Sequence, residues 1–422
     1  MPHTASGRSL RAFFERSEYR TELRFRKGAA MTQQSASGGF GGFGGFGGFG
    51  GFGGFGGFGG FGGSGGFGGF GGFGGFGGTD SPIVADALLH SRDGIVGQWL
   101  PPAATPSELL PDRPRALERW EPWVRASVFD FEMFSRLGFT QAGTTSAVWH
   151  LEVPAGIPPV GVYHDLVSIK RPTKAQFRNH LLFLDRYADL RGDRASEILS
   201  QLGGAAAFLS SVSFVRPDRT RWTIELLAAA LRLANFVEMR FKHALACRRP
   251  SEFSPQVQPM ILTPSHGTLP SGHATEAFIT AFVLWKLLRA SSITPYGDIA
   301  WGRQLMRLAA RVAVNRTVAG VHFTIDSAAG AVLGLTLGHY FVARCGASAD
   351  YRAWGFDGTS FPLPSAGPPP LDGDFHWTAL YDLAAIPPAQ TATAYAAQGA
   401  VTPILPSASL DWLWKKAKSE WW

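Results

Sequence analysis

Residues 38–78 repeat the triplet GGF, with Ser64 once in the place of Phe, and this tract most limits what the chain can fold into. Glycine loses more conformational freedom on folding than any other residue, so two glycines in each triplet oppose regular structure. A collagen triple helix also has glycine at every third position, but it depends on proline, which the tract lacks. We therefore expect a disordered low-complexity segment, with the folded part of the chain after it.

Changes of composition around the repeat predict the remaining boundaries. Residues 1–37 are rich in arginine and are expected to be disordered, and Met31 is an alternative start of the chain. Residues 79–114 are interpreted as a linker, and residues 115–345 as an all-helical catalytic domain. Residues 346–422, rich in proline and alanine, are expected to form a tail that packs on this body.

The region after residue 115 shows mainly the apolar spacing of helices. In residues 174–202, Phe177, Leu181 and Leu184 fall on one side of a helix. The same spacing predicts further helices, over residues 117–137, 221–246, 271–290, 299–314 and 322–342. Proline and glycine interrupt residues 143–161, which indicates a loop with one or two brief strands. The predicted fold class is therefore all-α, a helical bundle.

Composition excludes several classes of function. The formal net charge is +7, but lysine and arginine are scattered among carboxylates, which argues against a nucleic-acid partner. Cys247 and Cys345 are the two cysteines, and neither a disulfide framework nor a zinc-binding spacing is present. Cys247 is interpreted as a buried thiol.

The sequence also gives expectations about location. No apolar segment followed by a small-residue cleavage site is found near the N-terminus, which argues against a secretory signal. The longest apolar run, residues 328–343, is interrupted by Thr336 and His339, so no membrane span is expected. These observations predict a cytoplasmic protein. The sequence does not fix its oligomeric state, and association into homo-oligomers stays open.

Two neighbouring segments carry groups that bind anions. Lys242 and Arg249 are seven residues apart, close to two helical turns, so both cations project from one face of a helix. In the stretch PSGHAT, Ser271 can cap the following helix, and Gly272 allows the backbone NH groups to approach an anion. His273 would lie beside that anion, where it can give or take a proton near neutral pH.

A third segment supplies another cation and a paired histidine. His322 and Asp326 are four residues apart, so on a helix the carboxylate can bind one imidazole nitrogen and leave the other free to act. That arrangement suits a nucleophile or a metal ligand. Arg316 can add a planar guanidinium to the same oxyanion. The three segments together predict a site for a tetrahedral or trigonal-bipyramidal anion.

In order, the patterns Lys-x6-Arg-Pro, Pro-Ser-Gly-His and Arg-x5-His-x3-Asp resemble the three-part signature of the type 2 phosphatidic acid phosphatase and vanadium-dependent haloperoxidase superfamily. They span residues 242–326. Asn315 departs from the serine that usually precedes the arginine. The resemblance implies the helical bundle of that superfamily, and it is strongest to the soluble bacterial haloperoxidase-like branch.

The resemblance also implies a role for each site residue. His322 would bond to phosphorus or vanadium, Asp326 would orient it, and His273 would act as acid and base. Five residues would hold the oxygens of phosphate or vanadate: Lys242, Arg249, Ser271, Gly272 and Arg316. His266, seven residues before His273, is expected beside the cofactor in the second shell, or else it is a loop histidine bound to backbone.

Two reactions suit such a site, and a third hypothesis is not enzymatic. The sequence favours a haloperoxidase that oxidises bromide or iodide with hydrogen peroxide at a histidine-bound vanadate cofactor, for which an organic acceptor is the second substrate. The alternative is a phosphatase that hydrolyses phosphate monoesters through a phosphohistidine and needs no cofactor. A zinc hydrolase is disfavoured because no HExxH motif occurs. A non-catalytic assembly protein would act through the GGF repeat.

Overall fold

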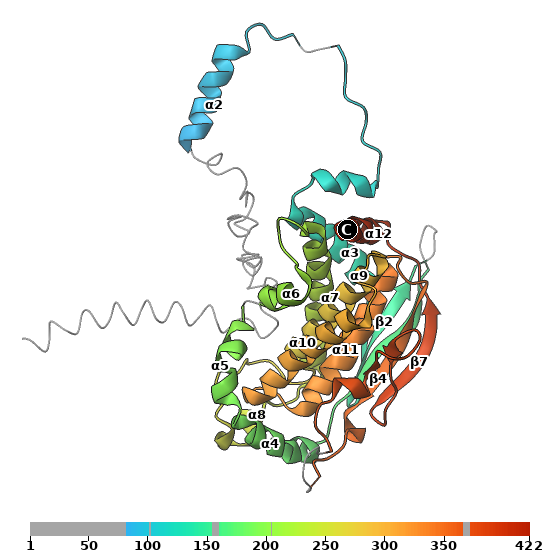
Figure 1. Ribbon diagram of the computed structural model, residues 1–422. Coiled ribbons are helices and arrows are strands. Elements are labelled where there is room, and N and C mark those ends of the chain that lie inside the picture. Colours follow the sequence, from blue (N-terminus) through green and yellow to red (C-terminus); the bar gives the residue numbers. More distant parts are fainter. Residues whose placement is uncertain (1–81, 101–102, 154–159, 204, 366–371) are drawn as a thin grey trace, which may run out of the picture.

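The structure is a computed structural model that describes residues 82–100, 103–153, 160–203, 205–365 and 372–422. The expected disordered segments, residues 1–37 and 38–78, lie outside these ranges. Four long helices form the centre of the molecule (Figure 1). They are α7 (Arg221–Leu245), α9 (Gly272–Ala290), α10 (Ile299–Val318) and α11 (Thr324–Arg344). Helix α9 packs against the other three and is buried along almost its whole length.

Glycines of α11 let it approach α9 closely. Gly330, Gly334 and Gly338 recur every four residues and therefore share one face of the helix. A Cβ atom at Gly334 would lie only 2.4 Å from the carbonyl oxygen of Thr275 on α9. The missing side chains thus bring the two backbones into contact, and this contact fixes the first turns of both helices relative to each other.

A mixed five-stranded sheet covers α11 on the side away from α10 (Figure 1). Its order is β1-β2-β3-β4-β7, with β3 and β4 parallel and the other pairs antiparallel. The strands are β1 (Leu137–Ala142), β2 (Thr145–Glu152), β3 (Val162–Lys170), β4 (Asp350–Asp357) and β7 (Ala396–Pro403). Buried and half-buried positions alternate along β2, as expected for a strand with one face on a core.

Shorter elements complete the structure around this core. The N-terminal and peripheral helices are α2 (Pro82–Ile95), α3 (Pro122–Phe134), α4 (Lys174–Ala188), α5 (Arg191–Ser200), α6 (Ala205–Ser213), α8 (Pro250–Phe253) and α12 (Ala408–Lys418). The 3-10 turns are η3 (Pro114–Arg119), η4 (Pro255–Val257), η5 (Gly358–Ser360) and η6 (Trp377–Ala379), and strands β5 (Tyr381–Asp382) and β6 (Ala389–Gln390) form a small second sheet.

The predicted all-α fold class is wrong, because the sheet makes the protein a mixed α and β structure. The helices predicted from apolar spacing are present, with residues 174–202 divided into α4 and α5. The sequence predicted one or two brief strands within residues 143–161, where β2 lies, but not the sheet, which also pairs strands that are distant in sequence. In particular, Val167 of β3 pairs with Trp354 of β4, nearly 200 residues later along the chain. Both cysteines are buried free thiols, as predicted for Cys247.

The expectation that no segment resembles a membrane span also needs correction. Among the described residues, α11 is long and apolar enough, at 21 residues, to cross a membrane by length and composition. Thr336 and His339 interrupt the apolar run, but the mean hydropathy of α11 still reaches that of a membrane span. The apolar window is 94% buried inside the fold, where the sheet and α9 cover it.

The close approach of α9 and α11 predicts that a methyl group added at this contact destabilises the protein, whereas one added at an open position does not. Gly334→Ala should lower the free energy of unfolding by about 2 kcal/mol, because the new Cβ forces the helices apart. Gly192→Ala is the matched control, because nothing lies within 4 Å of the position and alanine favours a helix. Urea denaturation of both variants measures the difference. Equal stabilities would contradict the packing described here.

Candidate functional site

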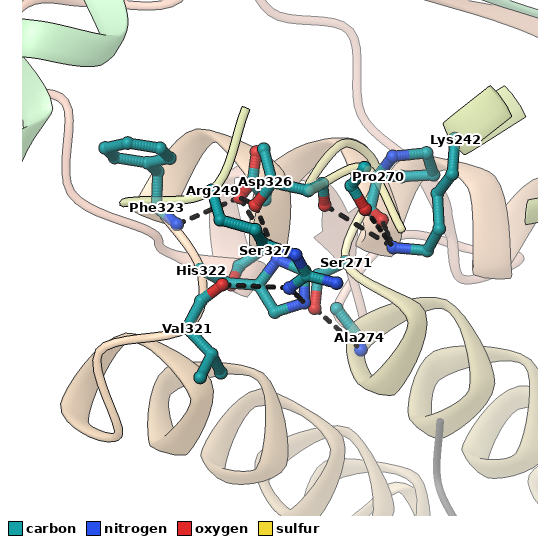
Figure 2. A network of polar contacts seen from close by, with 12 residues as sticks. Lys242, Arg249, Pro270, Ser271, Ala274, Val321, His322, Phe323, Asp326 and Ser327 are labelled. Atoms are coloured by element: carbon teal, nitrogen blue, oxygen red, sulfur yellow. Dashed lines mark hydrogen bonds and ion pairs between the residues drawn. The ribbon is translucent and has the colours of Figure 1, made fainter. Parts of the chain in front are cut away.

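The three sequence motifs meet where α9 and α11 begin (Figure 2). Ser271 is the N-cap of α9, and its backbone NH donates to the carbonyl oxygen of Asp326 on the first turn of α11, 3.0 Å away. Gly320, with a φ of +84°, ends the turn after α10 and redirects the chain toward α11. The segment from Arg316 to His322 is thereby folded back onto the start of α9.

His322 is held at one ring nitrogen by two oxygens. Its Nδ1 lies 3.1 Å from Asp326 Oδ2 and 3.1 Å from the hydroxyl oxygen of Thr268. Oδ2 of Asp326 also accepts from the Thr268 hydroxyl at 2.5 Å and from the Phe323 NH at 2.9 Å. A proton on Nδ1 satisfies the carboxylate, so the lone pair is placed on Nε2.

Arg249 lies against the other side of the same imidazole. Its Nη1 is 3.0 Å from Nε2 of His322 and donates to the Val321 carbonyl at 2.9 Å (Figure 2). Its Nε donates to the carbonyl of His266, and Nη2 lies 3.0 Å from Nδ1 of the His266 ring. The guanidinium therefore joins the nucleophilic edge of His322 to His266.

Lys242 reaches the site from the last turn of α7. Its Nζ donates to the backbone carbonyls of Gly267, Thr268 and Pro270, with the shortest bond to Pro270 (Figure 2). Three carbonyl acceptors suit a protonated amine. Burial, together with nearby Arg249, nevertheless lowers the pKa of Lys242 to about 8, although acidic neighbours oppose the shift.

Arg316 and His273 form the other side of the site. Nη1 of Arg316 is 3.4 Å from Nε2 of His273, on the first turn of α9. Within the part of the chain that the structure describes, Nε of Arg316 is buried and has no hydrogen-bond partner. A buried donor without an acceptor is costly, so an anion beside Arg316 would satisfy it.

Helix α5 and the residue after it orient Arg316 from behind. Gln201 is fully buried, and its Oε1 accepts from Arg316 Nη2 at 3.1 Å and from Asn315 Nδ2 at 3.0 Å. Asn315 also donates to Glu197, and its own carbonyl oxygen accepts from Arg194 at 3.1 Å. The side chain of Asn315 thus bonds to residues of α5 and to Gln201, and these bonds fix the helical turn that carries Arg316.

The site is deeply buried, and burial controls its charges. His322, His273 and Arg249 are at most 3% exposed. Burial lowers the pKa of His322 well below its ordinary value, and Arg249 and Lys242 lower it further, so the imidazole is neutral at physiological pH. Burial raises the pKa of Asp326 to about 6 although Thr268 and Phe323 donate to it, so it is mainly ionised at neutral pH.

The structure gathers every residue that the sequence analysis placed in the site. Most of them lie at the starts of α9 and α11 and at the adjacent ends of α7 and α10, while Arg249 directly precedes α8 and His266 lies in the loop before α9. The roles assigned to them remain predictions, including that of His266. Sequence reasoning missed Thr268 and Gln201. Thr268 lies three residues before Ser271, but a lone hydroxyl in a loop has no distinctive spacing, and Gln201 follows a helix far from the motifs.

Comparison with known proteins now identifies the class. Residues 224–347 match the model of the PAP2 superfamily, and this stretch contains all three motifs. It is therefore a PAP2 superfamily domain, which confirms the resemblance found in the sequence. No curated protein matches the chain.

One similar solved structure is a transmembrane PAP2-type phosphatidylglycerolphosphate phosphatase from Bacillus subtilis. It is 20% identical to this chain over 39% of this chain and 84% of that protein, with a TM-score of 0.32. The expectation of no membrane span is corrected by the length and composition of α11. The cytoplasmic location and the narrower haloperoxidase-like branch remain predictions.

Thr268 should be needed to hold His322. Thr268→Val removes the hydroxyl that bridges Nδ1 of His322 and Asp326 while keeping the shape of the side chain. We expect activity to fall by about 10–100-fold, because outer hydrogen-bond partners fix the orientation and basicity of a reactive histidine. Thr317→Val on α10 is the control, because it makes the same change of side chain at a residue that does not hold His322 or Asp326. Unchanged kcat in Thr268→Val would show that Asp326 alone is sufficient to orient His322.

Gln201 should position Arg316 for anion binding. Gln201→Leu removes the acceptor shared by Arg316 and Asn315. We expect phosphate to bind about tenfold more weakly, because the guanidinium loses one of the acceptors that direct it. Calorimetric titration with inorganic phosphate measures the change, and Gln256→Leu at the exposed η4 turn is the control. Equal phosphate affinities in the two variants would show that Gln201 does not position Arg316 for anion binding and only stabilises the fold.

Proposed function

We propose that the protein hydrolyses phosphate esters by phosphoryl transfer to His322. The observation that carries this proposal is the bond between Nδ1 of His322 and Asp326, which directs the lone pair of Nε2 toward Arg249. An imidazole that is neutral and oriented by a carboxylate is an activated nucleophile. The PAP2 superfamily match of residues 224–347 is consistent with this reaction.

Arg249 links substrate binding to activation of the nucleophile. In the structure its Nη1 donates to the Nε2 lone pair at 3.0 Å. A phosphoryl oxygen of the substrate would accept this hydrogen bond instead, because a charged acceptor binds a guanidinium more strongly than a neutral imidazole. Binding would therefore free the lone pair at the moment when phosphorus lies beside it.

The reaction proceeds in two balanced steps. Nε2 of His322 attacks phosphorus, the bond from phosphorus to the ester oxygen breaks, and His273 gives its proton to the departing alcohol. Asp326 stabilises the positive charge on the His322 ring. Water then attacks the phosphohistidine, His273 takes a proton from that water, and the bond from Nε2 to phosphorus breaks to release phosphate and restore His322.

The surrounding cations stabilise the transferring group. Lys242, Arg249 and Arg316 are all at most 3% exposed, and charges act strongly in such a dry environment. The Gly272 NH lies at the start of α9, where the helix dipole also favours an anion. The electrostatic stabilisation that phosphoryl transfer needs is thus supplied by side chains and backbone of this domain.

This ranking differs from the one based on sequence, which placed the haloperoxidase first. That preference rested partly on the expected lack of a membrane-spanning helix, which disfavoured a lipid phosphatase, and this premise is not kept. Phosphoryl transfer needs a nucleophile, a proton donor and cations, and the described residues provide all three. We therefore place the phosphatase first.

A vanadium-dependent haloperoxidase is the second candidate, and the position of His266 favours it. Arg249 holds the His266 ring, whose Nε2 is buried without a partner in the described parts of the chain. The cationic site and the unsatisfied Nε of Arg316 suit vanadate as well as phosphate. His322 would hold vanadate, which supplies Lewis-acid activation of peroxide for the oxidation of bromide or iodide. The assembly role of the GGF repeat stays a hypothesis, because the repeat lies outside the described residues.

One experiment on a split sample separates these functions. Phosphate-free protein receives p-nitrophenyl phosphate in one half, and orthovanadate, peroxide and bromide with a halogen-trapping dione in the other. We expect phosphate release that orthovanadate inhibits, because vanadate competes for the same cations. His322→Ala should lower this activity by at least about a thousandfold, as expected for a lost nucleophile.

The matched control is His243→Ala, which removes an exposed histidine of α7. It should keep the activity of the unaltered protein. Vanadate-dependent bromination that is lost with His322, without phosphate release, would instead establish the haloperoxidase. A folded sample inactive in both halves would contradict both enzymatic functions.

A further inference from the structure

Glu238 is a buried carboxyl group that the proposed reaction does not use. It lies on α7, one turn before Lys242, so the two side chains share a face of the helix. Glu238 is fully buried, and neither carboxyl oxygen has a hydrogen-bond partner within the described residues. An ionised carboxylate in such a place is costly unless a neighbouring cation compensates it.

A second buried carboxyl group lies close to the first. Glu276 is on α9, one turn after the Gly272 amide at the anion site, and it is only 5% exposed. It forms a hydrogen bond with Asn235 of α7 and interacts electrostatically with Glu238 and Lys242. The two glutamates therefore lie near each other and near Lys242, where α7 packs against α9.

The charges of the site decide the protonation of these two groups. Lys242, Arg249 and Arg316 supply three positive charges, and ionised Asp326 supplies one negative charge. A bound dianion then brings the site to neutrality only if both glutamates are protonated. Each ionised glutamate would leave a net negative charge in a buried region, which is unfavourable.

We propose that Glu238, with Glu276, is a positioning residue of the anion site that takes up a proton from solvent when a dianion binds beside Lys242. Before binding, an ionised Glu238 can neutralise Lys242. The arriving dianion takes over that role, and the carboxylate accepts a proton. The inference rests on the proposed oxyanion site, but it does not depend on which reaction follows.

The electrostatic surroundings support this coupling. Burial raises the pKa of Glu238 to about 8, while Lys242 and Arg249 oppose the rise. Burial also raises the pKa of Glu276 well above its ordinary value, and Glu238 raises it further. A dianion nearby raises both values again, because it disfavours a second negative charge. Proton uptake on binding should therefore be small near pH 6.5 and large above pH 8, by about one proton at most for Glu238.

Other charged groups on the elements packed against α7 are engaged elsewhere. Each has its own partner: Arg125 with Glu225, Asp130 with Arg232, His150 with Tyr340, Asp326 with His322, and Asp411 with Lys415. The cations that act on Glu238 are Lys242 and Arg249. Lys242 and His273, the proposed proton donor on the first turn of α9, are thus the groups whose titration must be separated from that of Glu238.

Calorimetry with inorganic phosphate tests the proposal. Titrations at about pH 8.5 in two buffers of different ionisation enthalpy give the number of protons taken up per phosphate bound. Wild-type protein should take up more protons than Glu238→Gln, and its affinity should fall by up to about tenfold per pH unit above pH 8. Glu238→Gln should bind phosphate more tightly than the wild-type protein at alkaline pH, and its affinity should depend less on pH. The reason is that the ionisation of Glu238 no longer opposes phosphate binding.

The comparison uses one matched control and one second variant. Glu132→Gln removes the same formal charge from α3, where Glu132 pairs with Arg344, and it should keep the wild-type uptake. Glu276→Gln should change the uptake in the same direction as Glu238→Gln, and it replaces that variant if the latter does not fold. The ionisation of phosphate itself is the same for every variant and cancels in the comparison.

The outcomes separate the inference from the proposed function. Lower proton uptake in both glutamine variants with normal uptake in Glu132→Gln supports the inference. Phosphate binding with unchanged proton uptake in the variants overturns it and assigns the proton to Lys242 or His273. If folded wild-type protein binds no phosphate at any pH, the oxyanion site itself is wrong, and the proposed function fails with it.

Discussion

The contact between the backbones of α9 and α11 is the constraint on which the site depends. Three glycines of α11 allow this contact, and it brings the first turns of the two helices together. The bond from the Ser271 NH to the Asp326 carbonyl then joins the anion-binding turn to the segment that orients His322. Because this arrangement belongs to buried helix ends, the reacting groups are placed by the core of the protein and not by surface loops.

Burial strengthens the attraction of the site for anions, but it also makes the charged side chains costly to desolvate. Lys242, Arg249 and Arg316 lie almost out of contact with water, where each attracts an anion strongly but is expensive to desolvate. Carbonyl oxygens of the chain offset part of that cost for Lys242 and Arg249. Among the described residues, Nε of Arg316 and both carboxyl oxygens of Glu238 are buried without a hydrogen-bond partner, and a bound dianion with a transferred proton would stabilise both groups.

The sheet and α5 give the domain features that its signature motifs do not specify. The sheet covers the side of α11 that would otherwise expose a long apolar surface, so a helix with the composition of a membrane span is enclosed by protein. Gln201, just after α5, fixes the turn that carries Arg316. Both features join distant parts of the chain to the PAP2 domain of residues 224–347.

The sequence by itself determined the long helices and the membership of the site. Apolar spacing marks a helix locally, and the three motifs carry chemistry that few other arrangements of lysine, arginine and histidine would share. Only the tertiary structure decided the sheet, the bridging role of Thr268 and the placement of Glu238 behind Lys242. These features depend on contacts between residues far apart in the chain. A local sequence pattern does not predict which distant residue will contact a given position.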